Sequence, residues 1–269
     1  MNRRVVSILP FGLALLCATA LPSLAQQGGV TGPSEATWAE IRTAAIGERP
    51  TDEQSGLLML NAPSRAEDAA LVPIEVAFKL PDGDARRVIA LTLIIDENPA
   101  PVGARFRFGE GKAAFALSTR VRVNSYSFVR AIAETSDGRL HMAKTYVKAA
   151  GGCSAPAVKD PAEARANLGE MRFRVFAPRG EAQVQIRHPN YSGLQMDQVT
   201  RLYTPAWYVE TLSVTQGAQP IFSLEGGISI SEDPTFRFSY AGGSQPVTVD
   251  AKDTEGRVFR GSFPGSGAS

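Results

Sequence analysis

The chain has 269 residues, with 28 basic and 27 acidic side chains and a formal net charge of +1. This balance leaves neither the basic stripe of a nucleic-acid-binding protein nor the charged block of a protein that binds a membrane surface. Composition and charge therefore exclude both classes and favour an ordinary globular protein.

Residues 1–25 have the pattern of a secretory signal peptide. Arg3 and Arg4 form a positive start, Val5–Ala20 is largely apolar, and Ser23–Ala25 has the small-x-small pattern of a cleavage site. The apolar run is shorter than the ~20 residues that a membrane-spanning helix needs, which disfavours an uncleaved anchor. We expect a periplasmic mature protein with no stable membrane span, exported by the Sec route or on a weak twin-arginine signal.

Cleavage after residue 25 removes one of the two cysteines and leaves Cys153 alone. It also removes two arginines, so that 26 basic residues face 27 acidic ones. The mature chain cannot form an internal disulfide. An unpaired cysteine in an exported protein indicates either an intermolecular partner or a working thiol.

The first half of the mature chain is predicted to contain one short helix followed by strands. Ser34 is suited to cap a helix over residues 35–46, and Gly47 is suited to end it. Beyond it, apolar residues alternate with polar ones or form short apolar runs. The expected strands cover residues 74–80, 88–95, 115–123, 128–134 and 140–147. Asp137-Gly138 predicts a hairpin turn between the last two, and the spacing is typical of an antiparallel sandwich.

The segment Gly151-Gly152-Cys153 follows the last of these strands. Glycines lack a Cβ, so the backbone before the cysteine is permissive and nothing bulky shields the sulfur. Six residues separate Val147 from Cys153, so an extended arm reaches ~20 Å from its anchor. The pattern predicts an exposed thiol that is presented to other molecules. The alternative is a surface linker that contains a cysteine by chance.

A second set of strands follows the cysteine. Asp160 is suited to start a short helix that Gly169 ends. The expected strands cover residues 171–177, 182–187, 208–215, 220–224, 235–240, 246–251 and 257–263. The predicted fold is all-β, with a short N-terminal helix and two immunoglobulin-like antiparallel β-sandwich domains joined by a flexible, cysteine-bearing linker. The expected boundaries are 26–149 for the first domain, 150–169 for the arm and linker, and 170–263 for the second domain, before a disordered tail over 264–269.

Short motifs in each half resemble two known families. The first half resembles SoxY, the sulfur-compound carrier of the thiosulfate-oxidising system, in four segments: Asp96–Pro99, Ser118–Val123, Ala131–Leu140 and Gly151–Cys153. The second half resembles SoxZ, the partner of SoxY, in five segments: Ile186–Pro189, Ser192–Gly193, Pro205–Ala206, Ile228–Ser231 and Pro234–Phe238. The chain as a whole is similar to fused, single-chain SoxYZ-like carriers that accompany periplasmic quinoprotein dehydrogenases.

The resemblance implies a periplasmic carrier without catalytic turnover and without a cofactor or metal. Cys153 would hold a thiosulfate- or sulfane-type sulfur intermediate covalently, and Gly151 and Gly152 would give the arm its flexibility. The implied partners are periplasmic redox and sulfur-processing enzymes, including a quinoprotein dehydrogenase system. The family's glycines after the cysteine are replaced by Ser154–Pro156, and the arm continues into a second domain. The arm is therefore tethered at both ends, which limits how far the cysteine can move.

Other classes of function stay open at this stage. A cysteine enzyme needs a base, for which His141 and His188 are the candidates, and a metal site would have to combine both with Cys153. Lys148 and Lys159 flank the arm and would either lower the thiol pKa or form a solvated rim. The third class is an interaction protein, either an accessory subunit of a dehydrogenase system or a disulfide-linked dimer.

Overall fold

The computed structural model describes residues 34–156, 165–197 and 200–266. Three predictions from the sequence fall wholly or partly outside these ranges. They are the signal peptide over 1–25, the start of the helix expected at Asp160, and the last three residues of the tail. In the part that is described, no helix is long and apolar enough to cross a membrane.

The N-terminal helix α1 covers Ala36–Ile46. The hydroxyl of Ser34 accepts the N–H of Ala36 at 3.1 Å, which satisfies one of the free donors at the helix start. Gly47, with φ of 72°, ends the helix in a conformation that other residues rarely adopt. Trp38 and Ile46 are the buried residues of α1 and pack on the apolar side chains of the adjoining sheet. The helix predicted over 35–46 is confirmed.

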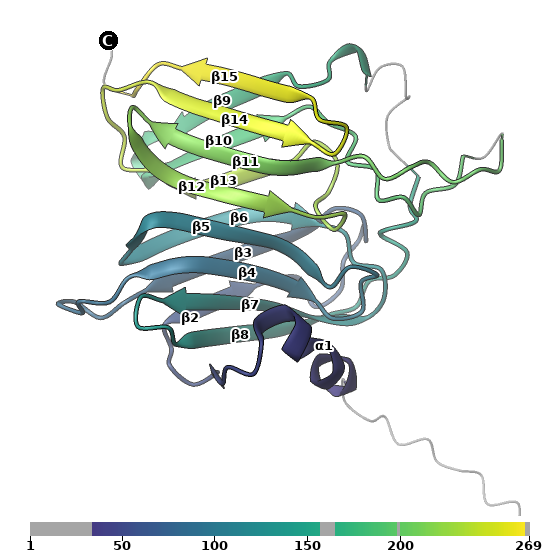
Figure 1. Cartoon of the computed structure of the whole chain (residues 1–269), viewed down its shortest axis with the longest axis horizontal. Helices are drawn as coiled ribbons and strands as arrows, with labels where there is room; N and C mark the ends of the chain where they lie inside the picture. The colour runs from purple at the N-terminus through teal and green to yellow at the C-terminus, as the bar shows by residue number, and fades with distance from the viewer. Residues whose placement is uncertain (1–33, 157–164, 198–199, 267–269) are drawn as a thin grey trace, which may run out of the picture. The chain divides into compact units, whose positions relative to one another are not determined.

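The strands form two sheets, one in front of the other in Figure 1. The nine-stranded sheet has the order β1-β8-β7-β4-β5-β12-β11-β14-β15, and the six-stranded sheet has the order β2-β3-β6-β13-β10-β9. The larger sheet consists of β1 (Thr51–Asp52), β4 (Val88–Ile95), β5 (Val102–Lys112), β7 (Ser127–Thr135), β8 (Leu140–Val147), β11 (Val209–Gln216), β12 (Gln219–Gly226), β14 (Val247–Asp253) and β15 (Val258–Phe263). The smaller consists of β2 (Leu58–Asn61), β3 (Val72–Lys79), β6 (Ala114–Val121), β9 (Met171–Phe176), β10 (Glu181–Ile186) and β13 (Thr235–Ser239). A single 3-10 turn, η1 (Ala177–Arg179), links β9 to β10.

Each sheet runs from the first half of the chain into the second without a break. In the larger sheet β5 pairs antiparallel with β12, with Arg105 opposite Glu225. In the smaller sheet β6 pairs with β13, with Leu117 opposite Phe238. The described residues, from 34 onward, belong to one compact unit. The two halves are therefore joined edge to edge through backbone hydrogen bonds in both layers, rather than packed face to face.

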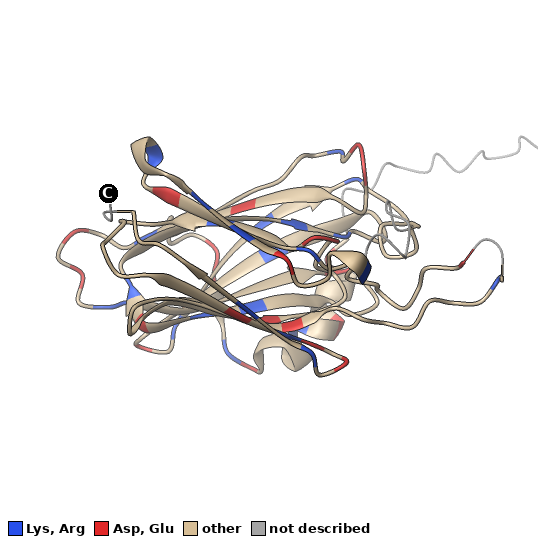
Figure 2. Cartoon of the chain, turned by 90° about the horizontal axis from the view of Figure 1, so that it is seen from above, with Lys and Arg blue, Asp and Glu red and all other residues tan. Residues whose placement is uncertain are grey.

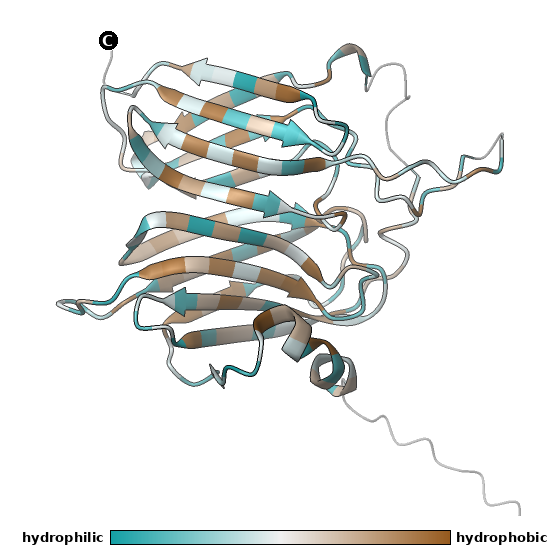
Figure 3. Cartoon of the chain, in the orientation of Figure 1, coloured by the Kyte–Doolittle hydropathy of each residue, from teal (hydrophilic) through white to brown (hydrophobic). Residues whose placement is uncertain are grey.

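The core between the sheets also crosses from one half to the other. Apolar side chains alternate with polar ones along most strands, as the banding in Figure 3 shows. Phe106 of β5 is fully buried, and its ring centroid lies 6.0 Å from that of Phe222 and 6.1 Å from that of Phe236. Edge-to-face aromatic contacts of this kind add to the free energy gained by burial. The two halves thus share one hydrophobic core.

Most strands lie where the sequence predicts them. The Asp137-Gly138 turn joins β7 to β8, with Gly138 at φ of 80°. The short β1 and β2 and the long β5 were not predicted. Blue lysines and arginines and red acidic residues are interspersed over the strands and loops drawn in Figure 2.

Candidate functional site: the Cys153 turn

The segment that leaves β8 runs back along the end of β6. The N–H of Gly151 donates to the carbonyl of Asn124 at 2.8 Å, and the N–H of Gly152 donates to the carbonyl of Val123 at 3.0 Å. The carbonyl of Gly151 then accepts the N–H groups of Ser154 at 3.1 Å and Ala155 at 2.9 Å. Cys153 therefore lies in a tight turn that the first half of the chain holds by its backbone.

The Cys153 side chain is fully buried, with an exposed fraction of 0%. The exposed thiol predicted from the sequence is wrong for this structure. The reason lies in the second half of the chain, whose loop between β10 and β11 covers the turn. Within that loop the hydroxyl of Ser192 donates to the carbonyl of Cys153, and Asn190 is fully buried beside it.

The two glycines before the cysteine have steric roles in this arrangement. Gly151 has a backbone φ of 80°, which residues that carry a Cβ rarely adopt. A Cβ on Gly152 would lie 2.0 Å from the carbonyl oxygen of Ala69 and 2.7 Å from that of Val123. Gly152 is therefore required for the close approach of three backbone segments. The predicted role of both glycines in arm flexibility stays a prediction.

Arg122 links the cysteine turn to the loop that covers it. It follows the last residue of β6, and its exposed fraction is 1%. One terminal nitrogen donates to the carbonyl of Gly152 at 3.2 Å, and the other donates to the carbonyl of Asn190 at 3.4 Å. A single guanidinium thus binds the backbone next to Cys153 on one side and the second half of the chain on the other. The sequence reasoning did not single out Arg122, because it is one of many arginines in alternating strands.

The environment of Cys153 disfavours its thiolate. Burial raises the pKa of the thiol to about 11, while the positive charge of Arg122 acts in the opposite direction and only partly compensates. An unperturbed cysteine has a pKa of ~8.5. At neutral pH the enclosed sulfur is therefore a neutral and poorly nucleophilic thiol.

Segments that carry the family-like motifs meet around this turn. The side-chain amide of Asn98 donates to the carbonyl of Arg122 at 2.7 Å and to the hydroxyl of Ser229 at 2.8 Å. The hydroxyl of Ser231 donates to the carbonyl of Ala70 at 2.6 Å. Residues 70, 98, 122, 229 and 231, from both halves of the chain, are thereby joined by buried hydrogen bonds.

The two histidines bind residues other than Cys153. His141 lies at the start of β8, about six residues or ~20 Å of strand from the end that leads to Cys153. His188 is fully buried, accepts the N–H of Asn190 at 3.0 Å and lies 3.6 Å from the carboxylate of Asp253. Burial lowers the pKa of both imidazoles. Among the described residues neither imidazole is hydrogen-bonded to Cys153: His141 lies 3.4 Å from the Thr135 hydroxyl, and the contacts of His188 are those just given.

Neither of the other predicted features supplies chemistry at the turn. Among the described residues, no three His, Cys, Asp or Glu side chains are grouped so as to hold a metal ion. The backbone N–H of Lys148 bonds to the carbonyl of Ser64 at 2.9 Å, while its exposed side chain does not shift the thiol pKa. Lys159 lies outside the described residues.

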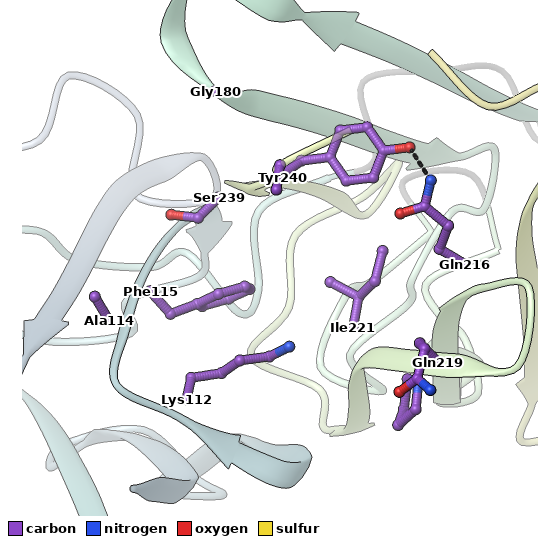
Figure 4. Close-up of a pocket in the computed structure, with 11 residues that line it drawn as sticks. Lys112, Ala114, Phe115, Gly180, Gln216, Gln219, Ile221, Ser239 and Tyr240 are labelled. Carbon is purple, nitrogen blue, oxygen red and sulfur yellow. Dashed lines mark hydrogen bonds between the residues drawn. The ribbon is translucent and has the colours of Figure 1, made fainter. Parts of the chain in front are cut away.

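A separate pocket of about 450 Å³ lies where the two halves meet at the other end of β6 (Figure 4). Phe115, Ile221 and Tyr240 form much of its wall, and Gln216 donates to the Tyr240 hydroxyl at 2.9 Å. Lys112 is the one charged residue in its lining. The residues that line this pocket include no cysteine and no histidine.

Comparisons with known proteins place both halves in named families. Residues 42–153 match the family model described as sulfur oxidation protein SoxY, and residues 178–264 match the model described as sulphur oxidation protein SoxZ. The first range ends at Cys153. Together the two ranges cover more than half of the chain. None of the curated proteins matches the chain.

Two solved structures are similar to a part of the chain. One is the sulfur carrier protein SoxY from Chlorobium limicola f thiosulfatophilum, which is 23% identical, with 43% of this chain and 97% of that chain covered at a TM-score of 0.36. The other is a superoxide reductase (neelaredoxin) from Ignicoccus hospitalis, which is 19% identical, with 41% of this chain and 86% of that chain covered at a TM-score of 0.29. Likenesses at this level carry no functional argument.

Proposed function

Because the chain belongs to the SoxYZ family, as a SoxY domain followed by a SoxZ domain, we propose that it carries a sulfur compound covalently on Cys153. One observation carries the proposal. The cysteine that ends the SoxY match lies in a buried turn, where the SoxY half holds its backbone and a loop of the SoxZ half bonds to its carbonyl.

The proposed cargo is a thiosulfate- or sulfane-type group. In loading, the Cys153 sulfur forms a bond to the sulfane sulfur of thiosulfate, and the adduct is Cys–S–S–SO₃⁻. The thiol loses its proton to water, and two electrons pass to a redox enzyme that acts as the acceptor. The carrier itself supplies the attachment point, while partner enzymes supply the electron transfer and the later steps.

Loading requires the Cys153 turn to open. In the closed arrangement the thiol pKa of about 11 leaves almost no thiolate at neutral pH, and the sulfur has no route to a partner. Release from the second-half loop would return the thiol to water and to an ordinary pKa. Rotation about Gly151 and Gly152 is the simplest way to allow this movement. Closure around a loaded cysteine would shield the labile sulfur chain from reductants.

We place this activity in the periplasm, on the strength of the signal-like residues 1–25. The partners proposed are redox and sulfur-processing enzymes of the same compartment, including a quinoprotein dehydrogenase system. The two tethers of the arm limit how far Cys153 can travel, so partners must approach the carrier closely.

The test is the sulfur-oxidation rate of a host strain whose only copy carries Cys153→Ala. Alanine is preferred to serine because the site is buried, and a serine hydroxyl would be left there without a designed partner. We expect complete loss of carrier-dependent oxidation, with folding checked by thermal melting. Ser154→Ala, at the exposed neighbouring position, is the matched control and should keep the full rate. Normal oxidation with Cys153→Ala would refute the carrier function and favour an accessory subunit.

A further inference from the structure

Arg122 is a buried cation whose hydrogen-bonding capacity is largely unused. A guanidinium has five N–H donors, and two of them are taken by the carbonyls of Gly152 and Asn190. The Nε of Arg122 is buried without a hydrogen-bond partner among the described residues. A buried arginine is costly unless its charge and its donors are satisfied.

Arg130 is a second buried arginine of this fold, and unlike Arg122 it is fully paired. Arg130 is also fully buried, but its guanidinium forms a bidentate pair with Asp96, at 2.9 and 2.7 Å, and a further ion pair with Glu35. Arg122 forms no ion pair with any described carboxylate. Glu232 and Asp68 act on it only at longer range.

The group that Arg122 does face is the cysteine turn. It binds the carbonyl of the residue before Cys153, and it is the only charged group that shifts the pKa of the Cys153 thiol. Burial leaves that thiol neutral at ordinary pH, so the unloaded turn supplies no negative charge to Arg122, on which Glu232 and Asp68 act only at longer range. A cargo attached to Cys153 would add a group to this enclosed space.

We propose that Arg122 binds the anionic, oxygen-bearing end of a sulfur cargo on Cys153 when the turn is closed. This inference rests on the proposed function and gives the cargo a chemical class, a sulfur chain that ends in a sulfonate. The oxygens of a sulfonate are acceptors for the donors that Arg122 leaves unused, and charge-assisted hydrogen bonds are stronger than neutral ones. The closed state therefore selects cargo by charge and is less favourable for an uncharged adduct.

Two adducts of similar size test this charge selection. Tetrathionate reacts with the Cys153 thiolate at an inner sulfur, where the central S–S bond breaks, thiosulfate leaves with the electron pair, and Cys–S–S–SO₃⁻ forms. Methyl methanethiosulfonate reacts at its sulfenyl sulfur, methanesulfinate leaves, and the neutral Cys–S–S–CH₃ forms. Neither reaction needs an added oxidant. Labelling at alkaline pH, followed by return to pH 7, gives the two forms of the full chain.

The readout is the rate at which a phosphine reductant removes each adduct from the folded chain. Protection is the rate of removal of the same adduct in denaturant divided by this rate. We expect the sulfonate adduct to be protected about 10- to 100-fold better than the methyl adduct, which is the worth of one hydrogen bond to a charged group. Arg122→Gln should abolish this preference, and Arg122→Lys should keep part of it. Arg120→Gln is the matched control, because Arg120 lies two residues away and bonds to Asp233 and Thr235 instead.

Equal protection of the two adducts in the unsubstituted chain would overturn the proposal, even if Arg122→Gln failed to fold. Retention of the full preference in a folded Arg122→Gln would also overturn it. Failure of the proposed function has a different signature. In that case protein isolated from its host would carry no adduct on Cys153, whatever the charge preference of the site.

Discussion

Replacement of Gly152 by alanine should force the Cys153 turn open. An alanine Cβ at this position would lie 2.0 Å from the carbonyl oxygen of Ala69, and all three atoms within 3 Å are backbone atoms that cannot rotate away. The closed turn and the added carbon are therefore incompatible. Because the turn is held by local backbone bonds and by Ser192, its release should leave the two sheets intact.

The size of the effect follows from the ionisation of the thiol. At pH 7 a thiol with a pKa of about 11 is ionised to a fraction of roughly 10⁻⁴, whereas a pKa of ~8.5 gives roughly 3 × 10⁻². Opening should therefore raise the alkylation rate of Cys153 at least about 300-fold. Loss of steric shielding adds to this factor.

Gly151→Ala is the graded control for this experiment. A Cβ at position 151 has open space, with the hydroxyl oxygen of Ser154 nearest at 3.9 Å, but the backbone φ of 80° is unfavourable for alanine. The cost of about 1–2 kcal/mol predicts a rise in the alkylation rate of roughly tenfold.

The assay is the pseudo-first-order rate of iodoacetamide modification at pH 7, followed by intact mass and compared with the rate in denaturant. The expected order is the unsubstituted chain, then Gly151→Ala, then Gly152→Ala. A folded Gly152→Ala whose Cys153 reacts as slowly as that of the unsubstituted chain would refute the closed turn described above.

Three further predictions concern stability and assembly. The folded state disfavours the Cys153 thiolate, so the free energy of unfolding should be unaffected below pH ~8.5 and fall by about 3 kcal/mol as the pH rises to about 11; denaturant titrations should show no such loss in Cys153→Ala. Phe106→Ala should destabilise the chain by about 3–5 kcal/mol, measured by urea unfolding, because its ring contacts aromatic residues of the other half. Proteolytic cleavage between residues 155 and 165 should leave the halves together on size exclusion, since β5–β12 and β6–β13 pairing crosses the seam; fragments that separate without denaturant would contradict this.

The strands with regular alternation and clear turns were predictable from the sequence, whereas β5 was not. This strand contains Gly103, Gly109 and Gly111, which interrupt the apolar pattern. Each of these glycines lies where a Cβ would come within 3 Å of another side chain, so they reflect tight packing at the centre of the sheet. Because β5 pairs with β12 of the second half, a prediction without β5 could not show how the halves are connected.

The position of Cys153 in the sequence identified the candidate site, but its burial could not be predicted. By themselves, the two glycines before the cysteine indicate an extended arm with an exposed thiol. The loop that covers the turn bonds to the Cys153 carbonyl through Ser192 and to Arg122 through Asn190, residues that are nearly 40 positions away and belong to the other half. Arg122 was hidden for the same reason, since its unusual burial depends on residues from both halves.

The central claim is that Cys153 is the covalent attachment point for a sulfur cargo. It is tested most directly by the mass of the Cys153 peptide from protein isolated from its host without reductant, during growth on thiosulfate. We predict a reductant-sensitive mass increase on this peptide that corresponds to added sulfur and oxygen and is absent after growth without a sulfur source. An unmodified Cys153 peptide under both conditions, from protein trapped rapidly in acid, would contradict the account.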